Sequence, residues 1–184
     1  LVSPVNKFDI LPSKNYLDVM QGDGQDIVKL VAFNNDLLVF KNDDLFIIDC
    51  SGEYEILKQT IYNLGIDNEK QVVKTPNAIY WVNGSGVHGY NGEDPVSNLL
   101  KDRIDSLTWR DSIYNEQTFI EWDPKTSMIV LFTRYQGDYF YSGNEPSNIL
   151  MVNSETGAVF LKNDLGIGAT GIIPSGCIIA DNIL

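Results

Sequence analysis

The fold is indicated most clearly by Asp36-Leu37-Leu38-Val39-Phe40-Lys41, followed by Asn42-Asp43-Asp44 and then Leu45-Phe46-Ile47-Ile48-Asp49. Two short apolar runs flank a polar turn, and Asn and Asp tolerate the left-handed backbone that tight turns require. Each run is apolar almost throughout instead of alternating, which is typical of a strand covered on both faces. Residues 36–49 therefore predict a β-hairpin that is buried on both sides.

Further hairpins follow along the chain, each with turn-forming residues between two apolar runs. They occupy residues 78–90, 118–132 and 149–161, and a last strand begins near Ile172. The turn Asn83-Gly84-Ser85-Gly86 is the clearest of them, because an Asn-Gly pair is a strong hairpin signal. Short runs rich in Val, Ile, Phe and Tyr, separated by such turns, predict an all-β chain.

A repeat organises these hairpins. Asp26-Ile27-Val28-Lys29-Leu30 recurs as Gln71-Val72-Val73-Lys74-Thr75, 45 positions later, and a third, looser unit begins near Glu116. A period of about 40–45 residues, with roughly four strands in each unit, is typical of propeller blades. The predicted fold is thus all-β, with β-propeller-like blades of antiparallel strands. A β-sandwich whose hairpins resemble one another is the alternative.

The repeat divides the chain into predicted parts. They are a lead-in segment (residues 1–25), a first unit (26–70), a second unit (71–115), a looser third unit (116–167) and the start of a further strand or blade (168–184). Propellers close with about four to eight blades. These units therefore predict a partial propeller, and both ends are interpreted as belonging to a longer polypeptide.

Helical signals are weak. Residues 98–107 place apolar side chains at i and i+4, which predicts a helix of about two turns. Residues 54–62 fit either a strand or a helix, and residues 135–146 are interpreted as an insertion in the third unit.

The composition limits the class of protein. With 13 Lys and Arg against 25 Asp and Glu, the net charge is −12, and so acidic a surface repels phosphate and anionic lipid. A single His excludes sites that need two imidazoles, and the absence of a Cys-x-x-Cys pair excludes thioredoxin-like chemistry. No apolar run reaches roughly 18 residues, so no membrane span is predicted. Cys50 and Cys177 are expected to be small buried hydrophobes, and a single disulfide between them is the alternative.

No motif indicates catalysis, a metal or a cofactor. His88 alternates with apolar neighbours and is expected to face solvent or a neighbouring blade. No Gly-x-Ser-x-Gly elbow, P-loop or dinucleotide fingerprint accompanies it. The pairs Asp23 with Asp26 and Asp43 with Asp44 carry oxygen atoms that Ca²⁺ could use, but they fit no calcium loop and are interpreted as turn residues.

Three other groups of residues are candidate sites. Glu121 and Asp123 could serve a glycosidase, but Asp123 is more simply the start of a hairpin turn. Asn83-Gly84-Ser85 has the form of a glycosylation sequon and is also interpreted as a turn. The predicted interaction surface lies in the insertion and consists of Tyr135, Tyr139 and Tyr141. Packing of these tyrosines against a neighbouring blade or subunit is the alternative.

Several runs between residues 8 and 165 together resemble a known family. They are Phe8-Asp9-Ile10-Leu11-Pro12, Asn15-Tyr16-Leu17-Asp18-Val19, Gly22-Asp23-Gly24-Gln25-Asp26-Ile27-Val28-Lys29-Leu30, Asn35-Asp36-Leu37-Leu38-Val39-Phe40-Lys41, Leu45-Phe46-Ile47-Ile48-Asp49, Thr75-Pro76-Asn77-Ala78-Ile79-Tyr80-Trp81-Val82-Asn83, Gly86-Val87-His88-Gly89-Tyr90-Asn91-Gly92 and Asn98-Leu99-Leu100. In this pattern the chain resembles the β-propeller structural proteins in the tails of short-tailed bacteriophages, of the nozzle, muzzle or packaged-DNA-stabilisation type. The third unit departs most from the pattern.

The resemblance implies a structural protein of the virion tail, with no catalytic residue, metal or cofactor. Its expected partners are other tail proteins and copies of itself, arranged in a ring around the channel through which DNA is ejected. The expected acidic wall would let DNA pass without specific binding. The alternative is a β-propeller binding module that recognises a host glycan or protein, and a glycan-degrading enzyme ranks last.

Overall fold

The architecture is all-β in a computed structural model that describes residues 17–20, 22–93, 96–134, 147–162, 178–179 and 182–183. Three antiparallel four-stranded sheets hold most of these residues, and within each sheet the strands lie in the order of the sequence. The described residues form a stack of sheets and no closed ring. The all-β class is therefore confirmed, while the division of the chain into units stays a prediction.

The three sheets differ mainly in the length of their outer strands. The first contains β1 (Ile27–Phe33), β2 (Asp36–Lys41), β3 (Leu45–Asp49) and β4 (Ile56–Ile61); the second contains β5 (Val72–Lys74), β6 (Ile79–Asn83), β7 (Gly86–Tyr90) and β8 (Ser97–Asn98); the third contains β9 (Phe119–Asp123), β10 (Met128–Arg134), β11 (Ser147–Asn153) and β12 (Val159–Lys162). A short hairpin of β13 (Ile178–Ile179) and β14 (Asn182–Ile183) follows.

The predicted hairpins are present. Strands β2 and β3 pair across the turn at residues 42–44, β6 pairs with β7 across Asn83-Gly84-Ser85-Gly86, and β9 pairs with β10. The fourth hairpin joins β11 to β12. Strand β1 begins within the first of the two matching sequence runs, residues 26–30, and β5 lies within the second, residues 71–75. Each is the first strand of its sheet.

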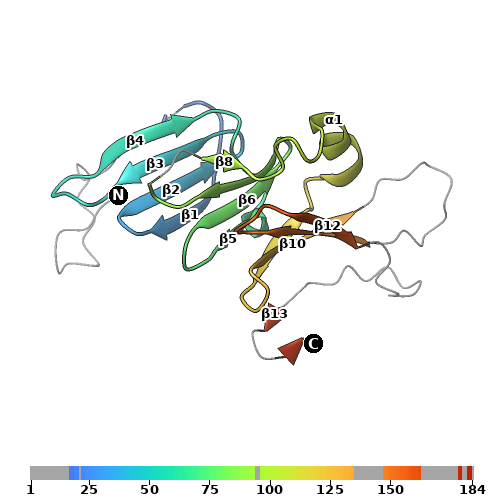
Figure 1. Ribbon diagram of the computed structural model, residues 1–184. Coiled ribbons are helices and arrows are strands. Elements are labelled where there is room, and N and C mark those ends of the chain that lie inside the picture. The colour runs from blue at the N-terminus through green and yellow to red at the C-terminus, as the bar shows by residue number, and fades with distance from the viewer. Residues whose placement is uncertain are drawn as a thin grey trace.

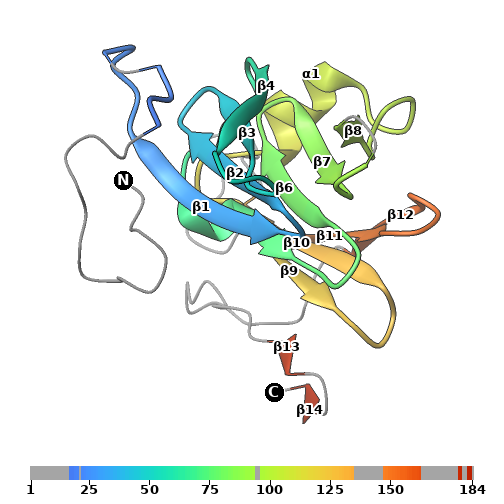
Figure 2. The same ribbon diagram turned by 90° about the vertical axis from the view of Figure 1, so that its left-hand side faces the viewer.

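The second sheet lies between the other two, and both of its faces are buried (Figure 1). Successive side chains of a strand point to opposite faces. Ile79 and Trp81 therefore pack with Phe40, Leu45 and other residues of the first sheet. Tyr80 and Val82 on the opposite face join a second cluster with residues of the third sheet. Seen from the side of the first sheet, the other two lie behind it (Figure 2).

A third, smaller cluster lies on the face of the first sheet that points away from the second. Val39, Phe46 and Ile48 are buried there, with Leu17 and Val19 packed against them. The stretch that precedes β1 thus contributes apolar cover to the first sheet. All three sheets owe their stability to apolar faces, as the unbroken apolar character of the strands indicates.

The helix predicted over residues 98–107 is wrong. Asn98 ends β8, and its side chain accepts a hydrogen bond from the Leu100 amide, which forms a turn. The α-helical turn α1 (Ser106–Thr108) begins only after Asp105, whose side chain accepts from the Leu107 and Thr108 amides as an N-cap. A π-helical turn, η2 (Trp109–Ile113), continues it, and a single 3-10 turn, η1 (Glu69–Gln71), precedes β5.

The ambiguous residues 54–62 contain a strand, β4. The insertion at residues 135–146 and the last strand expected near Ile172 lie outside the described residues. None of the described helices is long and apolar enough to cross a membrane.

Candidate functional site

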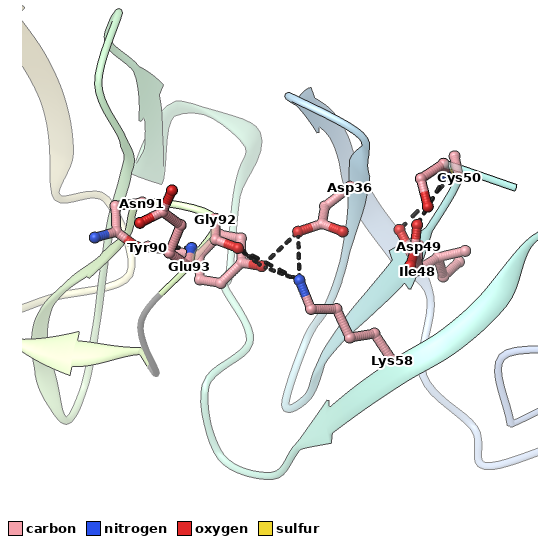
Figure 3. A network of polar contacts seen from close by, with 10 residues as sticks. Asp36, Ile48, Asp49, Cys50, Lys58, Tyr90, Asn91, Gly92 and Glu93 are labelled. Atoms are coloured by element: carbon pink, nitrogen blue, oxygen red, sulfur yellow. Dashed lines mark hydrogen bonds and ion pairs between the residues drawn. The ribbon is translucent and has the colours of Figure 1, made fainter.

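A polar network around the buried Asp36 joins the first sheet to the second, and Figure 3 shows it from close by. Asp36 begins β2 and is only 7% exposed. Its Oδ2 accepts hydrogen bonds from the Tyr90 hydroxyl at 2.5 Å and from Lys58 Nζ at 2.9 Å. Lys58 Nζ also donates to the Tyr90 hydroxyl at 3.0 Å. The three side chains come from β2, β4 and β7, so each contact with Tyr90 crosses the boundary between the two sheets.

The electrostatics of this network keep Lys58 and Tyr90 in their ordinary protonation states. The hydrogen bond to Asp36, and then the one to Tyr90, raise the pKa of Lys58, which stays an ammonium ion. Burial, helped by Asp36, raises the pKa of Tyr90, which stays a neutral phenol. Such an arrangement holds the two sheets together and activates neither a base nor a nucleophile.

A second set of contacts lies where the first strands of neighbouring sheets run side by side. Lys29 of β1 donates through Nζ to the main-chain oxygens of Glu69 at 2.6 Å and Val72 at 3.0 Å. In return, Lys74 of β5 donates through Nζ to the main-chain oxygen of Ala32 at 2.6 Å. Burial lowers the pKa of Lys29, and the carboxylates of Glu69 and Glu121 oppose that shift. The two lysines tie β1 and β5 to each other reciprocally.

Glu121 and Asp123 have different surroundings, although both lie on β9. Burial raises the pKa of the half-buried Glu121, with Lys29 acting in the opposite direction. Asp123 accepts from the Thr126 hydroxyl at 2.6 Å and from the Lys125 amide at 3.0 Å, and the first of these bonds lowers its pKa most. Asp123 is therefore engaged in the β9–β10 turn, as the sequence indicates.

His88 lies on β7, is 4% exposed, and faces the first sheet's side of the second sheet beside Trp81. Its Nε2 is 3.0 Å from Ser85 Oγ and 3.2 Å from Asn83 Oδ1. Burial lowers the pKa of His88 to about 4. The ring is thus neutral at pH 7 and is held within the hairpin rather than facing solvent.

Asn83 of the formal sequon is itself buried. Its Nδ2 donates to the main-chain oxygen of Gly65 at 3.1 Å, and its Oδ1 accepts from the Ser85 amide and hydroxyl. A side chain with all its polar atoms engaged inside the fold is not presented as a glycan acceptor. This agrees with the interpretation of residues 83–86 as a turn.

The acidic turns considered for Ca²⁺ are engaged with protein groups. Asp23 forms an ion pair with the buried Lys41 at 2.7 Å, and this contact does most to lower the pKa of Asp23. Asp44 accepts from Gln25 Nε2 at 3.0 Å and from the Asn63 amide at 3.2 Å. Within the described ranges, no group of three or more His, Cys, Asp or Glu residues is arranged to hold a metal ion.

The expectation that Cys50 is buried is wrong. It follows β3 in the loop before β4, and its side chain is an exposed free thiol. The apolar run ends at Asp49, so the thiol has no sheet face to pack against. Partial desolvation, helped by the neighbouring Glu55 and Asp49 carboxylates, raises the pKa of this thiol. Cys177 lies outside the described residues.

Sequence reasoning missed both sets of contacts between sheets. Asp36, Lys58 and Lys74 each sit in a strand where a polar residue reads as an ordinary exposed position. One feature of the sequence could have indicated these contacts, namely the Lys that the two matching runs share, Lys29 and Lys74. Both lysines reach across the boundary between the first and second sheets. The predicted surface of Tyr135, Tyr139 and Tyr141 lies outside the part of the chain that the structure describes.

No family model matches this sequence, and a search of curated proteins finds no significant relative.

Proposed function

We propose that this chain is a structural virion protein, a nozzle- or muzzle-type component of a short-tailed phage tail that forms part of the DNA exit channel. The observation that carries the proposal is the use of polar groups at the boundary between the first two sheets. Lys29, Lys74 and the Asp36–Lys58–Tyr90 network all hold one sheet to the next. A stack tied in this way suits a part that bears load, and it complements the resemblance of the sequence to tail proteins.

The charge supports passage of DNA without specific binding. The net charge is −12, and an acidic wall repels the phosphate backbone. The ammonium groups of Lys29 and Lys74 are bound to main-chain oxygens of the neighbouring sheet, so neither is a free cation for phosphate. Partners in this proposal are other tail proteins and copies of the chain in a ring.

Electron-microscopy class averages of the particle that contains this chain test the proposal. We expect a ring of copies at the tail, surrounding a channel wide enough for duplex DNA. An isolated closed propeller with an open aromatic groove would contradict the proposal and favour the binding-module alternative, which rests on Tyr135, Tyr139 and Tyr141.

A DNA-retention assay at low salt tests the proposed passage of DNA without specific binding. The wild-type chain should not shift a labelled duplex. The matched variant Glu121→Lys, which adds a cation beside Lys29, should retain more DNA than the wild type. Tight retention by the wild type would contradict the proposed passive wall.

A further inference from the structure

The outer strand of the first sheet, β4, has a free hydrogen-bonding edge. It is the last strand in the order β1-β2-β3-β4 and pairs only with β3 among the described residues. Figure 1 shows it along the outer margin of the first sheet, at the end opposite β1. An edge strand presents a row of main-chain N–H and C=O groups that can pair with an added strand.

Large apolar and aromatic side chains surround this edge. Ile56 and Leu57 are exposed on β4, and Tyr54 and Tyr62 are exposed just before and after it. The corresponding outer strand of the second sheet, β8, has two polar residues, and that of the third sheet, β12, has four residues. Of these three corresponding strands, β4 is therefore the longest, and the aromatic side chains beyond its two ends could anchor a ligand.

The usual protection of an edge strand is only partly present. A Lys on the edge and a bulge are both devices that discourage pairing. The register between β3 and β4 does shift next to Ile48, but Lys58 points into the Asp36–Tyr90 network and its charge is compensated there. The side chain of Lys58 is 43% exposed, but its ammonium group is bound at the sheet boundary and so brings no uncompensated charge to the edge.

The charge around β4 favours a basic partner. Glu53 and Glu55 precede the strand, and Asp49 lies across from Ile56 in the register. With Lys58 neutralised by Asp36, the surroundings of the edge are acidic, as is the whole chain. A second copy would bring the same carboxylates to the pairing, and like charges oppose it.

We propose that β4 is a docking edge for an extended basic peptide, in which apolar residues alternate with Lys or Arg. Such a peptide would add a fifth strand to the first sheet by main-chain hydrogen bonds. Because successive side chains of a strand alternate between faces, its apolar side chains would share the face of Ile56, with Tyr54 and Tyr62 at the two ends, and its cations would point to the opposite face. The flanking carboxylates of Glu53 and Glu55 would attract those cations. This proposal does not depend on the proposed function.

The test uses a capped synthetic peptide of alternating Lys and Val, roughly eight residues long, which is the length of an ordinary strand. Calorimetric titration measures its affinity, and hydrogen exchange with mass spectrometry locates it. We expect the amides of β4 to exchange more slowly when the peptide is bound. Ile56→Lys and Tyr62→Lys should each weaken binding by about tenfold or more, as removal of an anchor does.

Three controls separate strand pairing from general charge attraction. Leu107→Lys adds the same charge at a site that is 60% exposed, close to the 64% of Ile56, and should leave the affinity unchanged. A peptide N-methylated at alternate residues keeps its charge but loses its donors and should not bind. A peptide with Glu in place of Lys should not bind either. The proposal would be overturned if the methylated peptide bound as tightly as the unmethylated one, or if Leu107→Lys weakened binding as much as Ile56→Lys. It would also be overturned if the peptide slowed amide exchange outside β4 instead of in it, or if the chain self-associated through β4.

Discussion

Two buried tryptophans differ in one hydrogen bond, and replacing each by phenylalanine measures what that bond contributes. Trp81 and Trp109 are 0% and 1% exposed. Nε1 of Trp109 donates to the main-chain oxygen of Asn83 at 2.9 Å, whereas Nε1 of Trp81 has no acceptor among the described residues. The two sites therefore match in residue type and burial and differ in the polar atom.

The expected difference follows from that atom. Both substitutions remove the same volume, so both should leave a similar cavity. Trp109→Phe also loses a hydrogen bond with a net value of about 0.5–1.5 kcal/mol, whereas Trp81→Phe removes an unpaired donor whose burial costs about 1–3 kcal/mol. We expect Trp109→Phe to lower the free energy of unfolding by about 2 kcal/mol more than Trp81→Phe.

Urea unfolding followed by far-ultraviolet circular dichroism measures the free energy of unfolding of each phenylalanine variant. Unchanged m-values show that the substitutions alter stability and not the surface exposed on unfolding. Trp81→Ala sets the scale: it removes a ring that packs edge-on against Phe40 at 5.4 Å and should cost about 3–5 kcal/mol. A near-neutral Trp81→Ala would contradict the position of Trp81 in the core. Equal costs for the two phenylalanine variants would refute the hydrogen-bond reasoning.

Three further predictions concern backbone strain, pH and the network between the sheets. Gly92→Val should lower the melting temperature more than Gly52→Val. Gly92 has a φ of +93°, and an added Cβ would lie 3.0 Å from the side-chain amide nitrogen of Asn34, whereas a Cβ at Gly52 would make only ordinary contacts. Equal shifts of the melting temperature in a thermal scan would contradict this. The pKa of His88 is about 4 in the folded chain and about 6.5 when unfolded, so its contribution is fully present above pH 6.5 and is lost as the pH falls towards 4. Urea titrations over this range should show His88→Gln losing less stability than wild type, by up to roughly 3 kcal/mol, and parallel pH profiles would argue against it. Lys58→Met should destabilise the chain more in the presence of Asp36 than in the Asp36→Asn background, with a coupling of about 0.5–3 kcal/mol in a double-mutant cycle; additive costs would show that the ion pair contributes nothing.

The sequence alone is sufficient for the strands and hairpins, because these depend on neighbouring residues. The alternation of apolar runs with Asn, Asp and Gly turns places β2, β3, β6 and β7 correctly, and unbroken apolar strands indicate sheets covered on both faces. Asp123 as a turn residue follows from the same local chemistry. Residues 98–107 show the limit of such reasoning, because apolar spacing predicts a helix while Asn98 and Asp105 direct the chain into a turn and a cap.

Only the tertiary structure decides which polar residues meet. Asp36 and Tyr90 are 54 positions apart, and Lys29 reaches Val72 from 43 positions away. Lys58 looks like an ordinary exposed lysine on an edge strand. Its side chain is indeed 43% exposed, but its ammonium group binds the buried carboxylate of Asp36 from β2, which requires a partner. The exposure of Cys50 and the free edge of β4 likewise depend on where neighbouring sheets end. These properties arise from packing between sheets, which brings distant segments together and leaves no periodic signal along the chain.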